Sequence, residues 1–469
     1  MQTMSDRAPA APRLEDRTDA LGMPIDDMRR LGYWVVDRVV EHYEHGADGP
    51  AILGGDAAEL RRILGGPVPE EPSDPVVALE ALVEVVLSHM QHGDHPRYFA
   101  RVPGPSSFAG VLGDWLGIGF NALASSWGGG SGPATVELVV LDWIRTLLGM
   151  PAGTEGVIVS GGSLSNLTAL AAARHARGPG LAYVSDQTHA SVGRGLDAIG
   201  FGHDAIRTLP TNEQFALDAD TLAAAVAHDR ASGRRPRFVI ATAGTTNTGA
   251  VDDLEGIADV CATEGLWLHV DGAYGAPGAF CDAGRAVLGG LDRADSITLD
   301  PHKWLFAPYD TGVLLVREPG TLERAFSIHP EYLADVRSDS GEVSFGDRSL
   351  ELSRRPRALK LWMMFRTYGA QRIGAAIERG IKLAEHAQAL IDADPAWECV
   401  TPAQLGIVTF TRLGWAAADH AARVTALSAD GFAALTSTEL RGRPALRLCT
   451  INPRTTEADI AQTLARLSG

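Results

Sequence analysis

The sequence predicts an α/β protein with a mainly parallel central sheet covered by helices on both faces, followed by a small α+β domain. Between about residues 155 and 316, short apolar runs alternate with helix-like segments. Strands with so few polar positions are typical of a parallel sheet buried on both faces. Glycine is abundant, at 52 of 469 residues, which suits a chain with many strand-to-helix turns. The length allows two or three structural units.

The segment before the predicted sheet is expected to form an N-terminal helical arm over residues 1–95. Residues 1–20 are polar and rich in Ala and Pro, which predicts disorder. Residues 26–45 carry apolar side chains at helical spacing. A second helix is expected after Asp74, which is suited to cap it, with Pro75 in the first turn.

Six apolar runs predict the strands of a large domain that we expect to span residues 96–355. In order they are GVIV, LAYV, RFVIAT, LWLHVD, SITL and TGVLLV. Polar side chains follow most of these runs. Because ligands of open α/β sheets bind beyond the carboxyl ends of the strands, these positions form the candidate site.

The last part of the chain predicts a small C-terminal domain over residues 356–469. A long helical pattern follows the RRPR stretch, and the runs GIVTFTRL and ALRLCTIN predict two strands. A final helix is expected from Thr456. Mixed elements of this kind indicate a second α+β layer beside the main sheet.

Composition excludes several classes of function. Lys and Arg number 41 against 58 Asp and Glu, a net charge of −17, which argues against nucleic acid and anionic membranes as partners. The four cysteines form no ligand cluster or disulfide framework, and no segment is apolar enough for a signal peptide or a membrane span. We therefore expect a cytoplasmic protein without a metal site.

The turn SGGSLSN, residues 160–166, is a candidate anion site. Gly161 and Gly162 allow close approach of a ligand to the backbone, and Ser163 offers a hydroxyl at the start of a helix. A plain strand-to-helix turn with a serine cap explains these residues equally well. No Lys follows the glycines, so the turn is not a P-loop.

Asp271 and Lys303 each follow a predicted strand. In DPHKWLF, partial desolvation is expected to lower the pKa of Lys303 and leave a nucleophilic amine that can form a Schiff base. Asp271 can pair with a protonated pyridine nitrogen. Taken singly, each residue fits a structural ion pair better. Together with the anion turn, they match the three attachment points of pyridoxal 5'-phosphate (PLP).

The order of motifs resembles the PLP-dependent group II amino acid decarboxylases, which include aromatic amino acid, glutamate and histidine decarboxylases. The resemblance rests on HPRYF, SGGSLSN, SDQTHAS, AGTTNTGAVD, LHVDGAYG, DPHKW and SRRPRALKLW, and covers roughly residues 75–455. It implies the aspartate-aminotransferase fold, fold type I of PLP-dependent enzymes. It also implies a homodimer with active sites at the subunit interface.

The resemblance assigns roles to individual residues. It implies that Lys303 forms the Schiff base, that Asp271 pairs with the ring nitrogen and that His189 stacks on the ring. Thr246 matches a residue lining cofactor and substrate, and the matches to phosphate contacts are Gly162, Ser163 and His302. The implied reaction converts an L-amino acid to its amine and CO₂ through a quinonoid intermediate.

One departure from the family pattern concerns the product. Aromatic decarboxylases carry a proton-donating tyrosine in a mobile loop, and the corresponding residues 334–349 contain none. Phe345 or Gly346 falls nearest to its position, and Tyr332 precedes the loop. In plant relatives a phenylalanine there accompanies aldehyde synthesis, so oxidative deamination remains an alternative to amine formation.

A second departure concerns the substrate. Arg101 and Val102 stand where the family has aromatic side chains, while Leu123 and Ser125 match positions contributed by the partner subunit. Arg101 is suited to bind a polar or acidic substrate tail, and an interface salt bridge is an equal alternative. The substrate stays open. A catalytically silent, dimeric interaction protein is the third reading of the chain.

Overall fold

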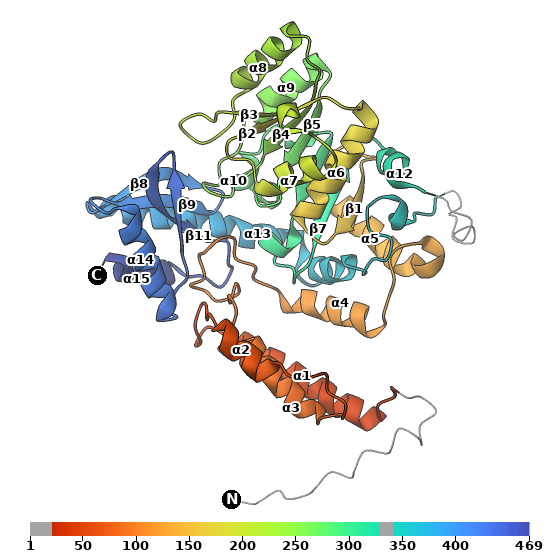
Figure 1. The fold of residues 1–469 in the computed structure, drawn as a ribbon, viewed down its shortest axis with the longest axis vertical. Coiled ribbons are helices and arrows are strands. Elements are labelled where there is room, and N and C mark those ends of the chain that lie inside the picture. Colours follow the sequence, from red (N-terminus) through yellow and green to blue (C-terminus); the bar gives the residue numbers. More distant parts are fainter. Residues whose placement is uncertain (1–20, 329–340, 469) are drawn as a thin grey trace, which may run out of the picture. The chain divides into compact units, whose positions relative to one another are not determined.

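The computed structural model describes residues 21–328 and 341–468 (Figure 1). By its internal contacts the chain divides into two compact units, Met1–Gly49 with Leu53–Gln91, and Pro50–Ile52 with His92–Gly469. The predicted disorder of residues 1–20 and the expectation for Tyr332 lie outside the described residues. Among the helices that are described, none is long and apolar enough to cross a membrane.

The first unit is helical, as the sequence predicts. Its helices are α1 Ile25–His45, α2 Ala57–Leu64 and α3 Pro75–Ala81, which continues as a π-helical turn, Leu82–Val86. The Asp74 side chain accepts a hydrogen bond from the Val76 amide at 2.9 Å, which confirms the predicted cap. Helix α2 was not predicted, because its eight residues are fewer than the stretch over which a helical period can be recognised.

The second unit contains a seven-stranded sheet with the order β1-β7-β6-β5-β4-β2-β3. All six predicted runs form strands, which confirms the mainly parallel sheet; only β7 runs antiparallel to its two neighbours. β3 was not predicted, and three of its four residues are not fully buried. The strands are β1 Glu155–Val159, β2 Leu181–Ser185, β3 Ile206–Leu209, β4 Pro236–Thr242, β5 Trp267–Asp271, β6 Ser296–Leu299 and β7 Gly312–Val316.

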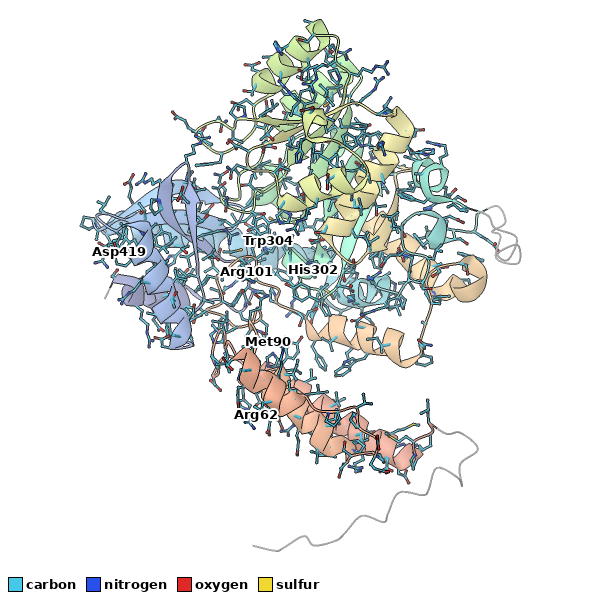
Figure 2. The ribbon with its side chains drawn as sticks, in the orientation of Figure 1. Arg62, Met90, Arg101, His302, Trp304 and Asp419 are labelled. Atoms are coloured by element: carbon cyan, nitrogen blue, oxygen red, sulfur yellow. The ribbon has the colours of Figure 1, made fainter. Side chains whose placement is uncertain are left out.

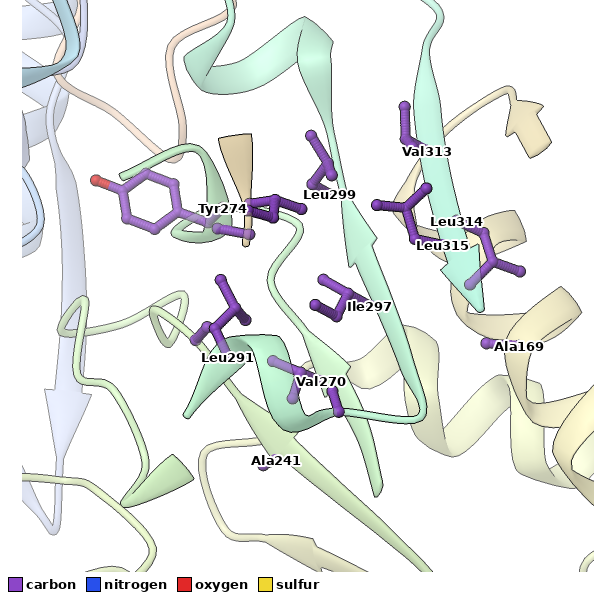
Figure 3. Packing of buried hydrophobic residues seen from close by; sticks show 14 of the residues in the cluster. Ala169, Ala241, Val270, Tyr274, Leu291, Ile297, Leu299, Val313, Leu314 and Leu315 are labelled. Carbon is purple, nitrogen blue, oxygen red and sulfur yellow. The ribbon is translucent and has the colours of Figure 1, made fainter. Parts of the chain in front are cut away.

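Helices cover both faces of this sheet. The connections through α6 Gly162–Arg177 and α7 Ala190–Ala198 cross the strand order in one direction, and those through α8 Ala219–Ala231 and α9 Leu254–Glu264 cross in the other. Because such crossovers are right-handed, the two pairs lie on opposite faces. Figure 3 shows the resulting apolar core, where side chains of β5, β6 and β7 pack together.

Further helices complete this part of the unit. Helices α4 Phe108–Gly119 and α5 Trp127–Leu147 precede the sheet and contact α13 Ala358–Ala393. Three short helices follow strands of the sheet: α10 Asp282–Arg285, α11 Pro301–Trp304 and α12 Thr321–Phe326. Helix α11 places Lys303 directly beyond the carboxyl end of β6.

A four-stranded antiparallel sheet with the order β10-β11-β9-β8 forms the C-terminal layer. The predicted strands are β9 Ile407–Arg412 and β11 Arg443–Cys449, and the predicted last helix is α15 Glu457–Ser468. The edge strands β8 Trp397–Gln404 and β10 Thr436–Leu440 were missed. Edge strands carry polar side chains and tolerate proline, so they lack a clear apolar run. Helix α14, Ala417–Ala429, packs beside β10 and β11.

The segment after His95 packs against the C-terminal layer. Tyr98 forms a β-bridge with Ala434, and Phe99 is fully buried in the core below the small sheet. The division into compact units does not separate residues 96–355 from residues 356–469. That domain boundary stays a prediction.

Candidate active site

The carboxyl ends of the parallel strands enclose a cavity of about 430 Å³ within the second unit. Its lining includes seven residues that the sequence selects as cofactor contacts: Gly162, Ser163, His189, Thr246, Asp271, His302 and Lys303. They come from five separate strand ends and helix starts, so the fold brings together side chains that are up to 141 positions apart in the chain. His302 lies beside Trp304 on the same short helix (Figure 2).

The anion turn forms the start of α6. A Cβ atom at Gly162 would lie 2.8 Å from Asp300 Oδ2 and 3.1 Å from the Ala273 side chain, so any larger residue would displace the Asp300 carboxylate. Ser163 follows in the first turn, where backbone N–H groups have no partner inside the helix. The positive end of the helix dipole also favours an anion at this place.

Lys303 has an acidic neighbour in the cavity. Its Nζ atom lies 3.0 Å from Asp300 Oδ2, and its side chain is 24% exposed. Burial opposes the charged amine, but the attraction and hydrogen bond of Asp300, helped by Asp271, outweigh it and raise the pKa of Lys303. The predicted lowering of this pKa was therefore wrong. Desolvation alone would lower the pKa of Lys303, but the Asp300 carboxylate three residues earlier raises it.

Trp304 anchors the lysine segment. Its fully buried ring stacks on Tyr274, with centroids 5.2 Å apart and an interplanar angle of 15°. The Tyr274 hydroxyl in turn donates a hydrogen bond to the carbonyl of Leu405, between β8 and β9. The small sheet therefore helps to fix the backbone that carries Lys303.

Asp271 ends β5 between Thr242 of β4 and Thr298 of β6. Its Oδ1 accepts a hydrogen bond from the Ala273 amide at 3.1 Å, and its Oδ2 accepts one from Asn166 Nδ2 at 2.9 Å. The carboxylate is 5% exposed and lines the cavity. Two donors hold this charge in one orientation.

Two histidines lie on the cavity wall. His189 caps α7, and its Nδ1 receives hydrogen bonds from the Ser191 hydroxyl at 2.8 Å and the Ser191 amide at 3.2 Å. The His302 ring lies 4.7 Å from the Tyr309 ring, centroid to centroid. Burial and the charge of Lys303 lower the pKa of His302, and the charge of Asp300 opposes this only in part. The imidazole is therefore neutral near pH 7.

The lining fits PLP. Two buried oxygens in it, Thr242 Oγ1 and Asp300 Oδ1, have no hydrogen-bond partner among the residues that the structure describes, as expected where a polar ligand completes the site. An amine, a carboxylate and a helix start match the aldehyde, ring nitrogen and phosphate of PLP. Within the described ranges, no group of three acidic, histidine or cysteine side chains could hold a metal ion.

Four residues suggested for the substrate pocket do not line the cavity of this single chain. Arg101 is exposed with φ 49°, and its amide donates to Thr436 Oγ1 at 2.8 Å. Val102 is partly buried and Leu123 is 40% exposed. Ser125 is tied to a neighbouring segment, because its hydroxyl accepts the Arg354 amide at 3.1 Å.

Phe345 also lies outside the cavity. Its side chain is fully buried, and the Arg354 guanidinium lies 5.1 Å from its ring centroid. The next amide, that of Gly346, donates to the Ser125 carbonyl at 2.8 Å. In this chain Phe345 packs in the core.

Several lining residues that carry no charge were not predicted from the sequence. Asn166, Ser191, Thr242 and Tyr274 all contribute to the cavity. One available signal was the position of Asn166, four residues after Gly162, on the α6 face that continues through small apolar side chains. A polar side chain on a buried helix stripe requires a hydrogen-bond partner and so indicates a site.

Comparisons with known proteins agree with this geometry. Residues 58–413 match the pyridoxal-dependent decarboxylase conserved domain. The chain is 42% identical over 463 residues to an aromatic-L-amino-acid decarboxylase of Bacillus atrophaeus, covering 96% of each chain. It is 33% identical to the enzyme of that name from Bos taurus, covering 84% and 85%.

Solved structures show the same fold. The structure of Oryza sativa TDC with PLP and tryptamine superposes with a TM-score of 0.90 at 29% identity, covering 95% of this chain and 98% of that one. The structure of Rhodiola rosea 4-hydroxyphenylacetaldehyde synthase gives 0.87 at 26% identity, with the same coverage. The fold is thus that of PLP-dependent decarboxylases, fold type I. This chain belongs to the pyridoxal-dependent decarboxylase family and is a PLP-dependent amino acid decarboxylase.

Proposed function

We propose that this enzyme converts aromatic L-amino acids to the corresponding amines and CO₂. The observation that carries the choice of substrate is the 42% identity, over 96% of both chains, to an aromatic-L-amino-acid decarboxylase. The cavity supports it, because no lysine or arginine other than Lys303 lines the described part of the site. A second carboxylate on the substrate would therefore lack a dedicated arginine partner there.

Different residues of the cavity hold different parts of PLP. Lys303 supplies the amine for the aldehyde carbon, Asp271 pairs with the ring nitrogen and His189 lies against the ring. The phosphate is held by Gly162 and Ser163 at the start of α6 together with His302, and Thr246 lines the space between cofactor and substrate. When bound, PLP supplies an electron-withdrawing ring that stabilises the electron pair left on the substrate after CO₂ departs.

Asp271 maintains the electron-withdrawing effect of the PLP ring. Its carboxylate is fixed by the Ala273 amide and by Asn166, so it faces the cavity with its charge already oriented. A charge that is oriented before the reaction needs no reorganisation as charge develops on the substrate. The geometry therefore favours a pyridine nitrogen that stays protonated.

A partner subunit completes the site in this proposal. Helix α4 and the residue after it expose large apolar side chains, with Leu116 56%, Ile118 60% and Phe120 83% exposed. An apolar patch of this kind is typical of a subunit interface. Leu123 and Ser125 would then serve the partner's cavity. Light scattering should give twice the mass of 49.6 kDa, and Phe120→Glu should shift the protein toward the monomer.

Aldehyde formation is the second candidate. It has the support of a 32% identity to a phenylacetaldehyde synthase of Arabidopsis thaliana over 83% of each chain. Decarboxylation without oxidation has the stronger support, from the relative with 42% identity. We also propose a cytoplasmic location, because all four cysteines are unpaired thiols, which suits a reducing compartment.

A substrate panel tests the proposal. PLP-loaded enzyme is incubated with tryptophan, tyrosine, phenylalanine, histidine, glutamate and aspartate, and CO₂, amine, ammonia and hydrogen peroxide are measured. We expect amine and CO₂ in equal amounts from the aromatic substrates. Turnover confined to glutamate or aspartate would overturn the aromatic assignment and favour a role for Arg101. Ammonia and peroxide in amounts equal to CO₂ would replace the amine product with the aldehyde.

A further inference from the structure

A chain of buried hydrogen bonds runs from the sheet interior to the cavity. Trp267 Nε1 donates to Ser296 Oγ at 3.0 Å, and Ser296 Oγ lies 2.9 Å from His269 Nδ1. His269 Nε2 lies 3.0 Å from Asn166 Oδ1. At most 2% of each of these four residues is exposed. Solvent therefore does not compete for the contacts, and each contact needs a hydrogen between its two atoms.

The direction of this chain follows from its acidic end. A carboxylate can only accept, so Asn166 directs its NH₂ group to Asp271 and its Oδ1 to His269 Nε2, which must then donate. At the other end indole N–H can only donate, so the Ser296 hydroxyl accepts from Trp267 and leaves its own hydrogen for His269 Nδ1. Burial, partly offset by Asp271, lowers the pKa of His269 to about 4, so the ring is neutral at pH 7. A neutral ring that accepts at Nδ1 carries its hydrogen on Nε2. It therefore donates to Asn166 Oδ1, which fixes the orientation of the amide.

The NH₂ group of the Asn166 amide then donates hydrogen bonds to two residues of the site. One N–H bond of Nδ2 points to Asp271 Oδ2 at 2.9 Å, and the other points to Ser191 Oγ at 3.2 Å. Because Ser191 Oγ accepts from Asn166, its hydroxyl hydrogen is directed to His189 Nδ1 at 2.8 Å. The Ser191 amide also donates to that nitrogen at 3.2 Å. Two donors at Nδ1 leave the His189 hydrogen on Nε2.

We propose that Asn166 is a positioning residue that holds the Asp271 carboxylate and the His189 ring in their orientations together. The relay Trp267-Ser296-His269-Asn166 fixes the amide, and the amide fixes both residues that face the cofactor. The inference rests on the proposed roles of Asp271 and His189. It extends them by adding a residue that touches neither substrate nor reacting atoms.

The central test replaces Asn166 with leucine, which is similar in volume and has no polar atoms. Asp271 then loses the side-chain donor Asn166 and, among the described residues, keeps the backbone hydrogen bond from Ala273. Hydrogen bonds to charged groups are the stronger ones, so we expect the dissociation constant of PLP, measured by titrating the apoenzyme, to rise about tenfold or more. We expect kcat to fall by a similar factor, with KM changed less than about threefold.

Thr168→Val is the matched control. Thr168 is fully buried on the same helix, and within the described part of the chain its hydroxyl donates to the Leu164 carbonyl, at 2.7 Å, and to no residue of the site. This variant should keep PLP affinity and kcat within about twofold of the wild-type values. If Thr168→Val loses as much as Asn166→Leu, the effect is one of helix packing and the inference is wrong. It is also wrong if Asn166→Leu binds PLP and turns over like the wild type.

Two further variants separate the arm of the relay that leads to His189 from the arm that leads to Asp271. Ser191→Ala removes the hydroxyl between Asn166 and His189 and leaves Asp271 untouched, so it should lower kcat with little change in PLP affinity. It also serves if Asn166→Leu does not fold, since unchanged kcat in Ser191→Ala would overturn the His189 arm. Asp271→Asn separates a failure of the proposed role of Asp271 from a failure of the inference about Asn166. If Asp271→Asn binds PLP normally, the proposed role of Asp271 fails; if it binds poorly and Asn166→Leu does not, only the relay fails.

Discussion

The Nζ atom of Lys303 lies 3.0 Å from Oδ2 of Asp300, and this contact raises the pKa of the lysine although burial opposes its charge. The amine is therefore held protonated before the cofactor arrives. A protonated amine is not a nucleophile, so the rate at which the apoenzyme takes up PLP should depend on pH. The same carboxylate is the natural acceptor of the lysine proton.

Asp300→Asn should therefore shift cofactor uptake to lower pH. Without the carboxylate, burial dominates and the pKa of Lys303 falls. Stopped-flow absorbance of apoenzyme mixed with PLP gives the rate constant at each pH, and at pH 8 we expect an increase of about tenfold for each pKa unit of change. Asp282→Asn is the control, because that side chain is 95% exposed on α10. Overlapping pH profiles for Asp300→Asn and wild type would contradict the prediction.

Lys303→Ala should abolish the visible absorption band of the PLP-loaded protein and reduce turnover by about 10²- to 10⁴-fold. Absorbance scans before and after borohydride check the first effect, and amine production checks the second. Lys382→Ala is a suitable control, since Lys382 is 66% exposed and paired with Glu378 on α13. A Lys303→Ala enzyme with near-normal rates would remove this lysine from the mechanism.

Arg354→Met should destabilise the fold by about 3–5 kcal/mol. Arg354 and Glu137 form an ion pair of 2.6 Å with side chains 0% and 1% exposed, and removing the guanidinium leaves a buried carboxylate without its cation. Urea unfolding followed by circular dichroism measures the loss. The exposed pair of Arg324 and Glu318 provides the comparison, and Arg324→Met should cost less than about 1 kcal/mol. Equal losses for both variants would show that burial of the pair has no special cost.

His269 should make the stability of the protein depend on pH between 4 and 6.5. Burial lowers the pKa of His269 from 6.5 to about 4, so the folded state binds fewer protons than the unfolded state in that interval. The contribution is complete above pH 6.5 and is lost as the pH falls toward 4, at most about 3 kcal/mol. His269→Gln keeps a donor for Asn166 and cannot titrate. Its unfolding free energy, measured in urea, should therefore lose less on acidification than that of the wild type, and parallel curves would contradict the assignment.

Tyr332→Phe should change the products if this tyrosine supplies the proton that follows loss of CO₂. The phenol is the tyrosine nearest in sequence to the loop of residues 334–349, and phenylalanine removes only its hydroxyl. We expect less amine and more ammonia and hydrogen peroxide per CO₂ than in the wild type. Tyr33→Phe, on the exposed face of α1, is the control. An unchanged product ratio would leave His189 or water as the proton source.

The sequence by itself determined six of the seven strands of the main sheet and the residues that follow them. Asp271, Lys303 and the Gly162 turn are found from local patterns, because an apolar run and the polar residue that ends it are neighbours in the chain. Parallel strands with helical crossovers place such ends at one edge of the sheet. The cavity and its seven predicted residues follow from that rule.

Only the tertiary structure decided how those residues are held. The contacts of Asn166 with Asp271 and His269 join positions 105 and 103 residues apart, so no local pattern contains them. The pKa of Lys303 depends on the distance to Asp300, which the turn into α11 sets at 3.0 Å. Phe345 was expected near the substrate and lies in the core, because an apolar side chain next to a loop packs wherever the fold offers space. Sequence specifies which groups are present, whereas distance and burial, which fix charge and hydrogen-bond direction, exist only in the folded chain.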